Sequence, residues 1–157
     1  MAVHGRLDAT GSVPLSEQRI HLKPHGLWYA CGTGWIDYAA RVFNQVDPYV
    51  YGIDVNLSGM RVIRTNEELA AFTDEFGATR YTGDGPGEFI DWTRVAARYT
   101  GIEICPRLGG MRWFAGTDWY HGWDVASGCI WTASAVVGWT ELASGGNVKT
   151  SITRGAY

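Results

Sequence analysis

The sequence predicts a single α+β domain that spans residues 1–157. Three observations support this fold class. The length fits one domain, which can bury roughly 70% of the surface that its unfolded chain exposes. Hydrophobic residues make up 46% of the chain and charged residues 18%, which is close to globular averages. Short β-forming runs also alternate with amphipathic helical stretches, and glycine or proline separates many of them.

The first half of the chain is predicted to hold four strands and one helix. Residues 1–8 form a short strand, followed by a proline-containing loop. Residues 26–30 are apolar and aromatic, which favours a buried strand. Apolar residues at spacings of three and four give residues 34–44 one apolar helical face. Residues 49–55 and 60–64 are rich in β-formers on either side of a Leu-Ser-Gly turn, so we expect them to pair as strands.

The second half is predicted to hold two helices and two strands. A capping threonine and an acidic first turn predict a helix over residues 66–76. Glycines and a proline predict a flexible loop over residues 78–88. A second helix is expected over residues 91–100, because its apolar residues share a face. Residues 102–105 and 128–131 are predicted as short strands.

Charge and chain ends limit the classes of function. The formal net charge is −3 and the basic residues are spread along the chain, so strong non-specific binding to nucleic acid is not expected. No apolar run approaches the ~20 residues of a membrane-spanning helix. The first residues lack the positive and apolar segments of a secretory signal. We therefore expect a cytoplasmic protein that does not enter a membrane.

Several common chemistries lack their sequence signals. Cys31, Cys105 and Cys129 form no C-x-x-C pair and are odd in number, so they are predicted to be reduced thiols. The four histidines have no ligand spacing with cysteines or acids, and no metal site is expected. G-x-S-x-G and G-x-x-x-x-G-K-[ST] are both missing from the sequence. Serine hydrolase and P-loop nucleotidase functions are therefore disfavoured.

The aromatic content is the most unusual feature of the composition. The chain has eight tryptophans and eight tyrosines. Such side chains each bury about 150–250 Å² and serve either in packing or in stacking. The sequence leaves two interpretations open, an aromatic core and a site that stacks on a flat-ring ligand.

Motifs in the first 40 residues follow one another in a recognisable order. His4 and Gly5 stand on the first expected strand, and a loop that ends at Pro24 separates them from the Gly-Leu-Trp-Tyr-Ala run of residues 26–30. The helix that follows carries Tyr38. This order resembles that of the diphtheria-toxin-like ADP-ribosyltransferases, a branch that includes the poly-ADP-ribose polymerases.

Two later runs agree with the same resemblance. Residues 99–104 read Tyr-Thr-Gly-Ile-Glu-Ile, which is similar to the strand that precedes the last catalytic strand in many of these transferases. Residues 122–125 read Gly-Trp-Asp-Val and look like their closing run. The resemblance implies two packed, mostly antiparallel sheets with flanking helices, NAD as substrate, and transfer of ADP-ribose to an unknown acceptor, protein or nucleic acid.

The resemblance also assigns residues to the NAD site. His4 would bind the ribose hydroxyls and serve in catalysis, and the backbone of Gly5 would hold the nicotinamide amide, to which glycine permits close approach. Trp28 stands where the family carries its ribose-contacting tyrosine, and Tyr29 stands where it carries phenylalanine. Tyr38 would stack on the nicotinamide ring.

The catalytic acid is less clearly placed. The glutamate of the family is not found before Cys129. Asp118 is the preferred substitute, and Asp124 and Glu103 are the alternatives on the late strands. A non-enzymatic binding or structural module remains the competing prediction, because tryptophan and tyrosine also dominate recognition surfaces.

Overall fold

The computed structural model describes residues 12–43, 49–83, 85–110 and 116–144. The strand predicted for residues 1–8, with His4 and Gly5, lies outside the described residues. The described helices are α1 (Gly34–Val42), α2 (Asn66–Phe76) and α3 (Trp92–Ala96). The described strands are β1 (Ile20–His21), β2 (Leu27–Ala30), β3 (Tyr49–Val55), β4 (Arg61–Ile63), β5 (Gly77–Thr82), β6 (Gly85–Asp91), β7 (Gly101–Ile104), β8 (Ser127–Ile130) and β9 (Val136–Ser144).

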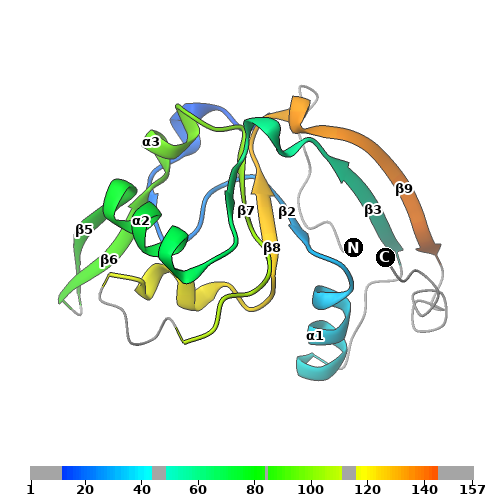
Figure 1. Cartoon of the computed structure of the whole chain (residues 1–157), viewed down its shortest axis with the longest axis horizontal. Helices are drawn as coiled ribbons and strands as arrows, with labels where there is room; N and C mark the ends of the chain where they lie inside the picture. The colour runs from blue at the N-terminus through cyan, green and yellow to red at the C-terminus, as the bar shows by residue number, and fades with distance from the viewer. Residues whose placement is uncertain (1–11, 44–48, 84, 111–115, 145–157) are drawn as a thin grey trace.

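The α+β class is confirmed, and the strands pair mostly antiparallel. The described strands form a four-stranded sheet in the order β2-β8-β7-β4, a three-stranded sheet in the order β1-β6-β5, and the pair β3-β9. Figure 1 shows the four-stranded sheet at the centre of the molecule. Helices α2 and α3 and the β5–β6 hairpin lie on one side of it, and α1 and the β3–β9 pair lie on the other.

Side-chain caps are present at the starts of α2 and α3. The Thr65 hydroxyl accepts a hydrogen bond from the Glu68 amide, and the Glu68 carboxylate accepts one from the Thr65 amide. These reciprocal bonds are a capping box, which satisfies amides that the first turn leaves free. At α3 the Asp91 carboxylate accepts hydrogen bonds from the amides of Thr93 and Arg94. Both helices begin within a residue of their predicted starts, but α3 ends at Ala96 and not at the predicted residue 100.

The expected pairing of residues 49–55 with 60–64 is wrong. Strand β3 pairs antiparallel with β9, while β4 pairs parallel with β7. The Leu-Ser-Gly segment forms a short 3₁₀ turn that does not close a hairpin. A parallel pair needs a long crossover connection, which the chain between β4 and β7 supplies through α2, the β5–β6 hairpin and α3.

The predicted loop over residues 78–88 is also wrong. Strands β5 and β6 form a hairpin in which Gly77 pairs with Ile90 and Thr82 pairs with Gly85. Proline is tolerated because β1 pairs only with the far end of β6, at Ile90 and Asp91. Among the described strands, none pairs with the end of β6 that carries Pro86 on the side away from β5, and a missing N–H on that side costs no ladder hydrogen bond.

The core has two parts, one on each face of the four-stranded sheet. The larger part packs this sheet against α2, α3 and the 3₁₀ turn Asp118–Gly122, and it contains the buried indoles of Trp92, Trp119, Trp123 and Trp131. The smaller part packs the opposite face against β3 and β9 through Leu27, Tyr29, Met60, Ile130 and Ala135. An aromatic core is thus one of the uses of the tryptophans.

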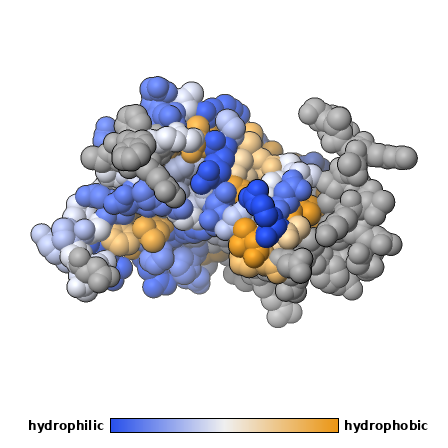
Figure 2. Space-filling model, turned by 90° about the horizontal axis from the view of Figure 1, so that it is seen from below, coloured by the Kyte–Doolittle hydropathy of each residue, from blue (hydrophilic) through white to orange (hydrophobic). Residues whose placement is uncertain are grey.

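Some large apolar side chains remain at the surface. Figure 2 shows apolar residues gathered on part of the face seen from below. Over the described surface as a whole, the large exposed apolar side chains include Val42 and Phe43 at the end of α1, and Val137, Trp139 and Leu142 on β9. Val136, the first residue of β9, packs against the smaller core cluster. From Trp139 to Leu142 the side chains of β9 are all exposed, so only the start of this strand is packed against the core.

Two further observations bear on the sequence predictions. Cys31, Cys105 and Cys129 are free thiols, as predicted. In the part of the chain that the structure describes, no helix is long and apolar enough to cross a membrane.

Phe72 is a fully buried member of the larger core cluster and provides a test of it. Its ring centroid lies 5.0 Å from that of Phe76, 5.6 Å from that of Trp119 and 6.1 Å from that of Trp92. Phe72→Ala removes these contacts and leaves a cavity, so we expect the free energy of unfolding to fall by about 3–5 kcal/mol. Urea unfolding measures this change.

Tyr81→Ala is the control, because the Tyr81 side chain is 82% exposed. It should change the free energy of unfolding by no more than about 0.5 kcal/mol. Equal effects of the two substitutions would contradict the assigned core.

Candidate functional site

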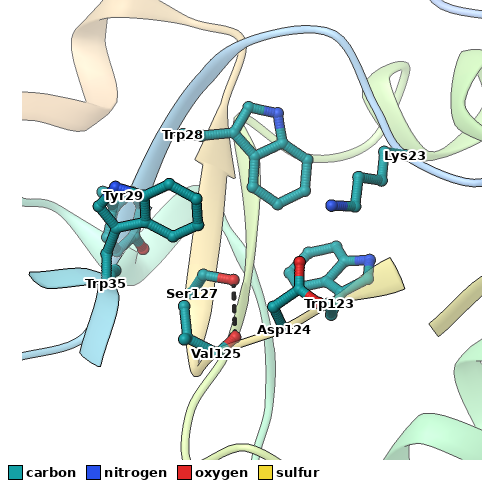
Figure 3. A pocket seen from close by; sticks show the side chains of 9 residues that line it. Lys23, Trp28, Tyr29, Trp35, Trp123, Asp124, Val125 and Ser127 are labelled. Atoms are coloured by element: carbon teal, nitrogen blue, oxygen red, sulfur yellow. Dashed lines mark hydrogen bonds between the residues drawn. The ribbon is translucent and has the colours of Figure 1, made fainter. Parts of the chain in front are cut away.

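A cavity of about 230 Å³ opens beside the edge strand of the four-stranded sheet. Figure 3 shows side chains converging on it from five segments of the chain. They come from the β1–β2 connection, strand β2, the start of α1, the segment after the 3₁₀ turn, and the start of β8. The lining residues are Lys23, Trp28, Tyr29, Ala30, Trp35, Trp123, Asp124, Val125 and Ser127.

Strand β2 contributes consecutive residues to the cavity because it lies at the edge of its sheet. Successive side chains of a strand point to opposite faces. Trp28 packs against the larger core cluster and Tyr29 belongs to the smaller one. A cavity beside an edge strand can be reached from both faces, so both residues line it.

Three indole rings, those of Trp28, Trp35 and Trp123, are among the side chains that line the cavity. The rings of Trp28 and Trp123 meet edge to face, with centroids 4.8 Å apart and an interplanar angle of 66°. Trp35 lies apart from this pair in Figure 3. Its ring is stacked on Tyr38, with centroids 5.6 Å apart and an interplanar angle of 29°. The aromatic surface suits a flat or cationic ring.

The floor of the site depends on one row of paired residues across three strands. Tyr29 of β2 and Glu103 of β7 are both register partners of Gly128 on β8. The Tyr29 hydroxyl donates a hydrogen bond of 2.7 Å to the Glu103 carboxylate, so the Tyr29 ring spans the intervening strand. A Cβ on residue 128 would lie 2.5 Å from the Tyr29 hydroxyl oxygen. Only glycine at this position leaves room for the ring.

The Tyr29 phenol is held in its neutral, donating form. Burial raises its pKa far above the ordinary value, and the hydrogen bond to Glu103 raises it further. Burial also raises the pKa of the nearby Cys31 thiol, and contact with Cys105 adds to this shift. The Cys31 thiol is therefore a poor nucleophile, since the reactive form of cysteine is the thiolate.

The cavity carries one side chain of each charge. The Lys23 ammonium lies 5.3 Å from the centroid of the Trp28 ring, within the range of a cation–π contact. The Asp124 side chain is exposed at the lining. The stretch that leads from Asp124 into β8 is held by a hydrogen bond of 3.0 Å, which the Ser127 hydroxyl donates to the Val125 carbonyl. The site thus combines an aromatic wall with two opposite charges.

Only some of the residues predicted to contact NAD line the cavity. Trp28 and Tyr29 line the cavity. Tyr38 does not line it and instead stacks on Trp35, which does. His4 and Gly5 lie outside the described residues.

The three candidate acids also differ in position. Asp118, the preferred one, is exposed on the 3₁₀ turn, and its Oδ1 lies 3.8 Å from Nδ1 of His121. It does not line the cavity, whereas Asp124 does. Glu103 is hydrogen-bonded to Tyr29 beneath the cavity.

Sequence analysis missed several lining residues, chiefly Lys23, Trp35, Trp123 and Ser127. The Gly-Trp-Asp-Val run at residues 122–125 was a signal for one of them, since it combines an indole and a carboxylate just before a strand. Lys23 has no motif around it. Within the described ranges, no group of three histidine, cysteine, aspartate or glutamate side chains could hold a metal ion.

Comparison with protein-family models, with curated proteins and with solved structures gives no match to this chain.

Gly128 offers a test of the row beneath the cavity. Gly128→Ala forces the Tyr29 ring away from Glu103, and we expect it to lower the free energy of unfolding by about 1–3 kcal/mol, as overpacking does. In a Tyr29→Val background the added methyl group has room, so Gly128→Ala should cost much less there. A double-mutant cycle measured by urea unfolding gives the coupling. Additive costs would show that the ring does not cross Gly128.

Proposed function

We propose that this chain binds NAD, with the nicotinamide ring in the cavity, and transfers the ADP-ribose group to a macromolecular acceptor. One observation carries the proposal. The cavity walled by three indoles is lined by Trp28 and Tyr29, two residues to which the resemblance with ADP-ribosyltransferases gives NAD contacts. The resemblance assigns both residues from sequence order alone, and both line the same cavity.

The chemistry of the ring supports this choice of ligand. Nicotinamide in NAD is a flat pyridinium ion, and indole faces attract cations. The exposed Asp124 carboxylate adds a favourable charge at the same cavity. The volume of about 230 Å³ lies below the ~300–1,000 Å³ of typical ligand pockets. We therefore place only the nicotinamide end of NAD inside it.

Transfer requires heterolysis of the bond between the ribose anomeric carbon and the nicotinamide nitrogen. The bonding electron pair goes to the nitrogen, so nicotinamide leaves as a neutral molecule and the ribose becomes an oxocarbenium-like cation. The acceptor attacks the anomeric carbon and loses a proton. A carboxylate that meets the positive charge on the ribose stabilises the transition state more than the ground state. Asp124 is our first choice for this role, because it lines the cavity and Asp118 does not.

A second candidate function is a binding module without chemistry. The position of Asp118 favours it, since the preferred catalytic acid is exposed and away from the cavity lining. One carboxylate oxygen of Glu103 also already accepts a hydrogen bond from the Tyr29 hydroxyl. In that case the indoles would hold a flat or cationic ring of a partner without breaking a bond.

Binding of NAD is the first test. Calorimetric titration of the full chain should give saturable heat with NAD, and the melting temperature should rise. Trp28→Ala should weaken binding about tenfold or more, because a central aromatic contact is lost. Trp139→Ala is the matched control, since that indole is 50% exposed on β9 and does not line the cavity. Absence of both heat and a melting shift at millimolar NAD would refute the proposal.

Turnover separates the two candidate functions. If Asp124 stabilises the oxocarbenium-like state, Asp124→Asn should reduce nicotinamide release by about 10²–10³-fold with little change in NAD affinity. The same assay on Asp118→Asn and Glu103→Gln decides which acid acts. His4→Ala tests the remaining predicted catalytic residue. Unchanged, background-level release in the wild type and all four variants would leave only the binding module.

A further inference from the structure

We infer that Lys23 forms a phosphate subsite, so that the cavity takes a ring and its phosphate as a unit, as in a pyridinium mononucleotide. This inference rests on the proposed function, since it assumes that a pyridinium ring occupies the cavity. It adds a ligand group and a residue that neither the motifs nor their resemblance indicated.

Lys23 is held in place at the cavity. Its ammonium group lies over the Trp28 ring at 5.3 Å from the centroid. Its stem passes close to Gly122, where an added Cβ would lie 3.2 Å from the Lys23 Cε. Burying the aliphatic stem while the charged end stays accessible is the usual behaviour of lysine at an apolar surface. The side chain is therefore partly ordered before a ligand arrives, which lowers the entropic cost of binding.

The charge of Lys23 has no acidic partner in the described part of the chain. The ion pairs found there join Arg98 to Glu75 and His121 to Asp118. Asp124, which shares the cavity lining, does not come within the 4.0 Å of an ion pair with Lys23. An ammonium group without a carboxylate is open to an anionic ligand, and lysine commonly binds phosphate as a point charge.

The two charges of the cavity match the two charges of one ligand class. A pyridinium nucleotide has a cationic ring next to an anionic phosphate. The indoles and Asp124 favour the ring, and Lys23 favours the phosphate. Figure 3 shows Lys23 next to Trp28 and on the side of the cavity where Trp123 and Asp124 lie, away from Trp35. A simple aromatic cation would use the indoles and be repelled by Lys23.

Two probes that differ only in the phosphate test the subsite. Nicotinamide riboside and nicotinamide mononucleotide share the cationic ring and the ribose. The wild-type chain should bind the mononucleotide about tenfold more tightly, as expected for one charge-assisted contact. This preference should shrink as salt is raised, because the contact is partly exposed. Calorimetric titration measures both affinities.

Variants assign the preference to one side chain. Lys23→Gln should abolish the preference for the mononucleotide while leaving affinity for the riboside unchanged or slightly higher, and Lys23→Arg should keep it. Arg80→Gln is the control, because it removes the same charge from an exposed position on β5 that does not line the cavity. That variant should keep the full preference.

The outcomes distinguish the subsite from the proposed function. If the wild type binds both probes equally, or if Lys23→Gln keeps the preference, the phosphate subsite is refuted and ring binding stands. If neither probe binds to the wild type while its melting curve shows a folded protein, the ring-binding proposal is refuted as well.

Discussion

The missing side chain of Gly128 is the constraint on which the rest of the site depends. Because β8 offers no Cβ at this point, the Tyr29 ring crosses it and its hydroxyl reaches Glu103 on the next strand. This bond ties the edge strand β2 to the interior of the sheet through a side chain as well as through its backbone ladder. It also keeps a polar pair satisfied where desolvation would otherwise be costly. The cavity is then built beside a fixed edge.

The aromatic core and the cavity wall are continuous. Phe72 contacts Trp119, Trp119 contacts Trp123, and Trp123 contacts Trp28, with ring centroids between 4.8 and 6.1 Å apart. Trp123 is only 1% exposed, yet it lines the cavity. The two interpretations of the tryptophan content are therefore compatible. The same rings that exclude water from the core present their outer members to the cavity.

Local signals predicted elements well and pairing poorly. Helix α2 was found because Thr65 and the apolar spacing act within a few residues of each other. The parallel pairing of β4 with β7 depends on contacts across a long crossover, which no local pattern encodes. The residues of the site likewise divide into those with a local sequence signal and those without one. Trp28 and Tyr29 stood in a recognisable run, whereas Lys23 gains its role only from the ring it covers.

The linked indoles also have an optical consequence. Trp92, Trp119, Trp123 and Trp28 follow one another at centroid distances of 5.9, 6.1 and 4.8 Å. Rings this close exchange electronic excitation without emitting light. Excitation energy absorbed deep in the core can therefore be transferred along the series to the indole at the cavity. A molecule that quenches Trp28 would then dim the emission of tryptophans that it never touches.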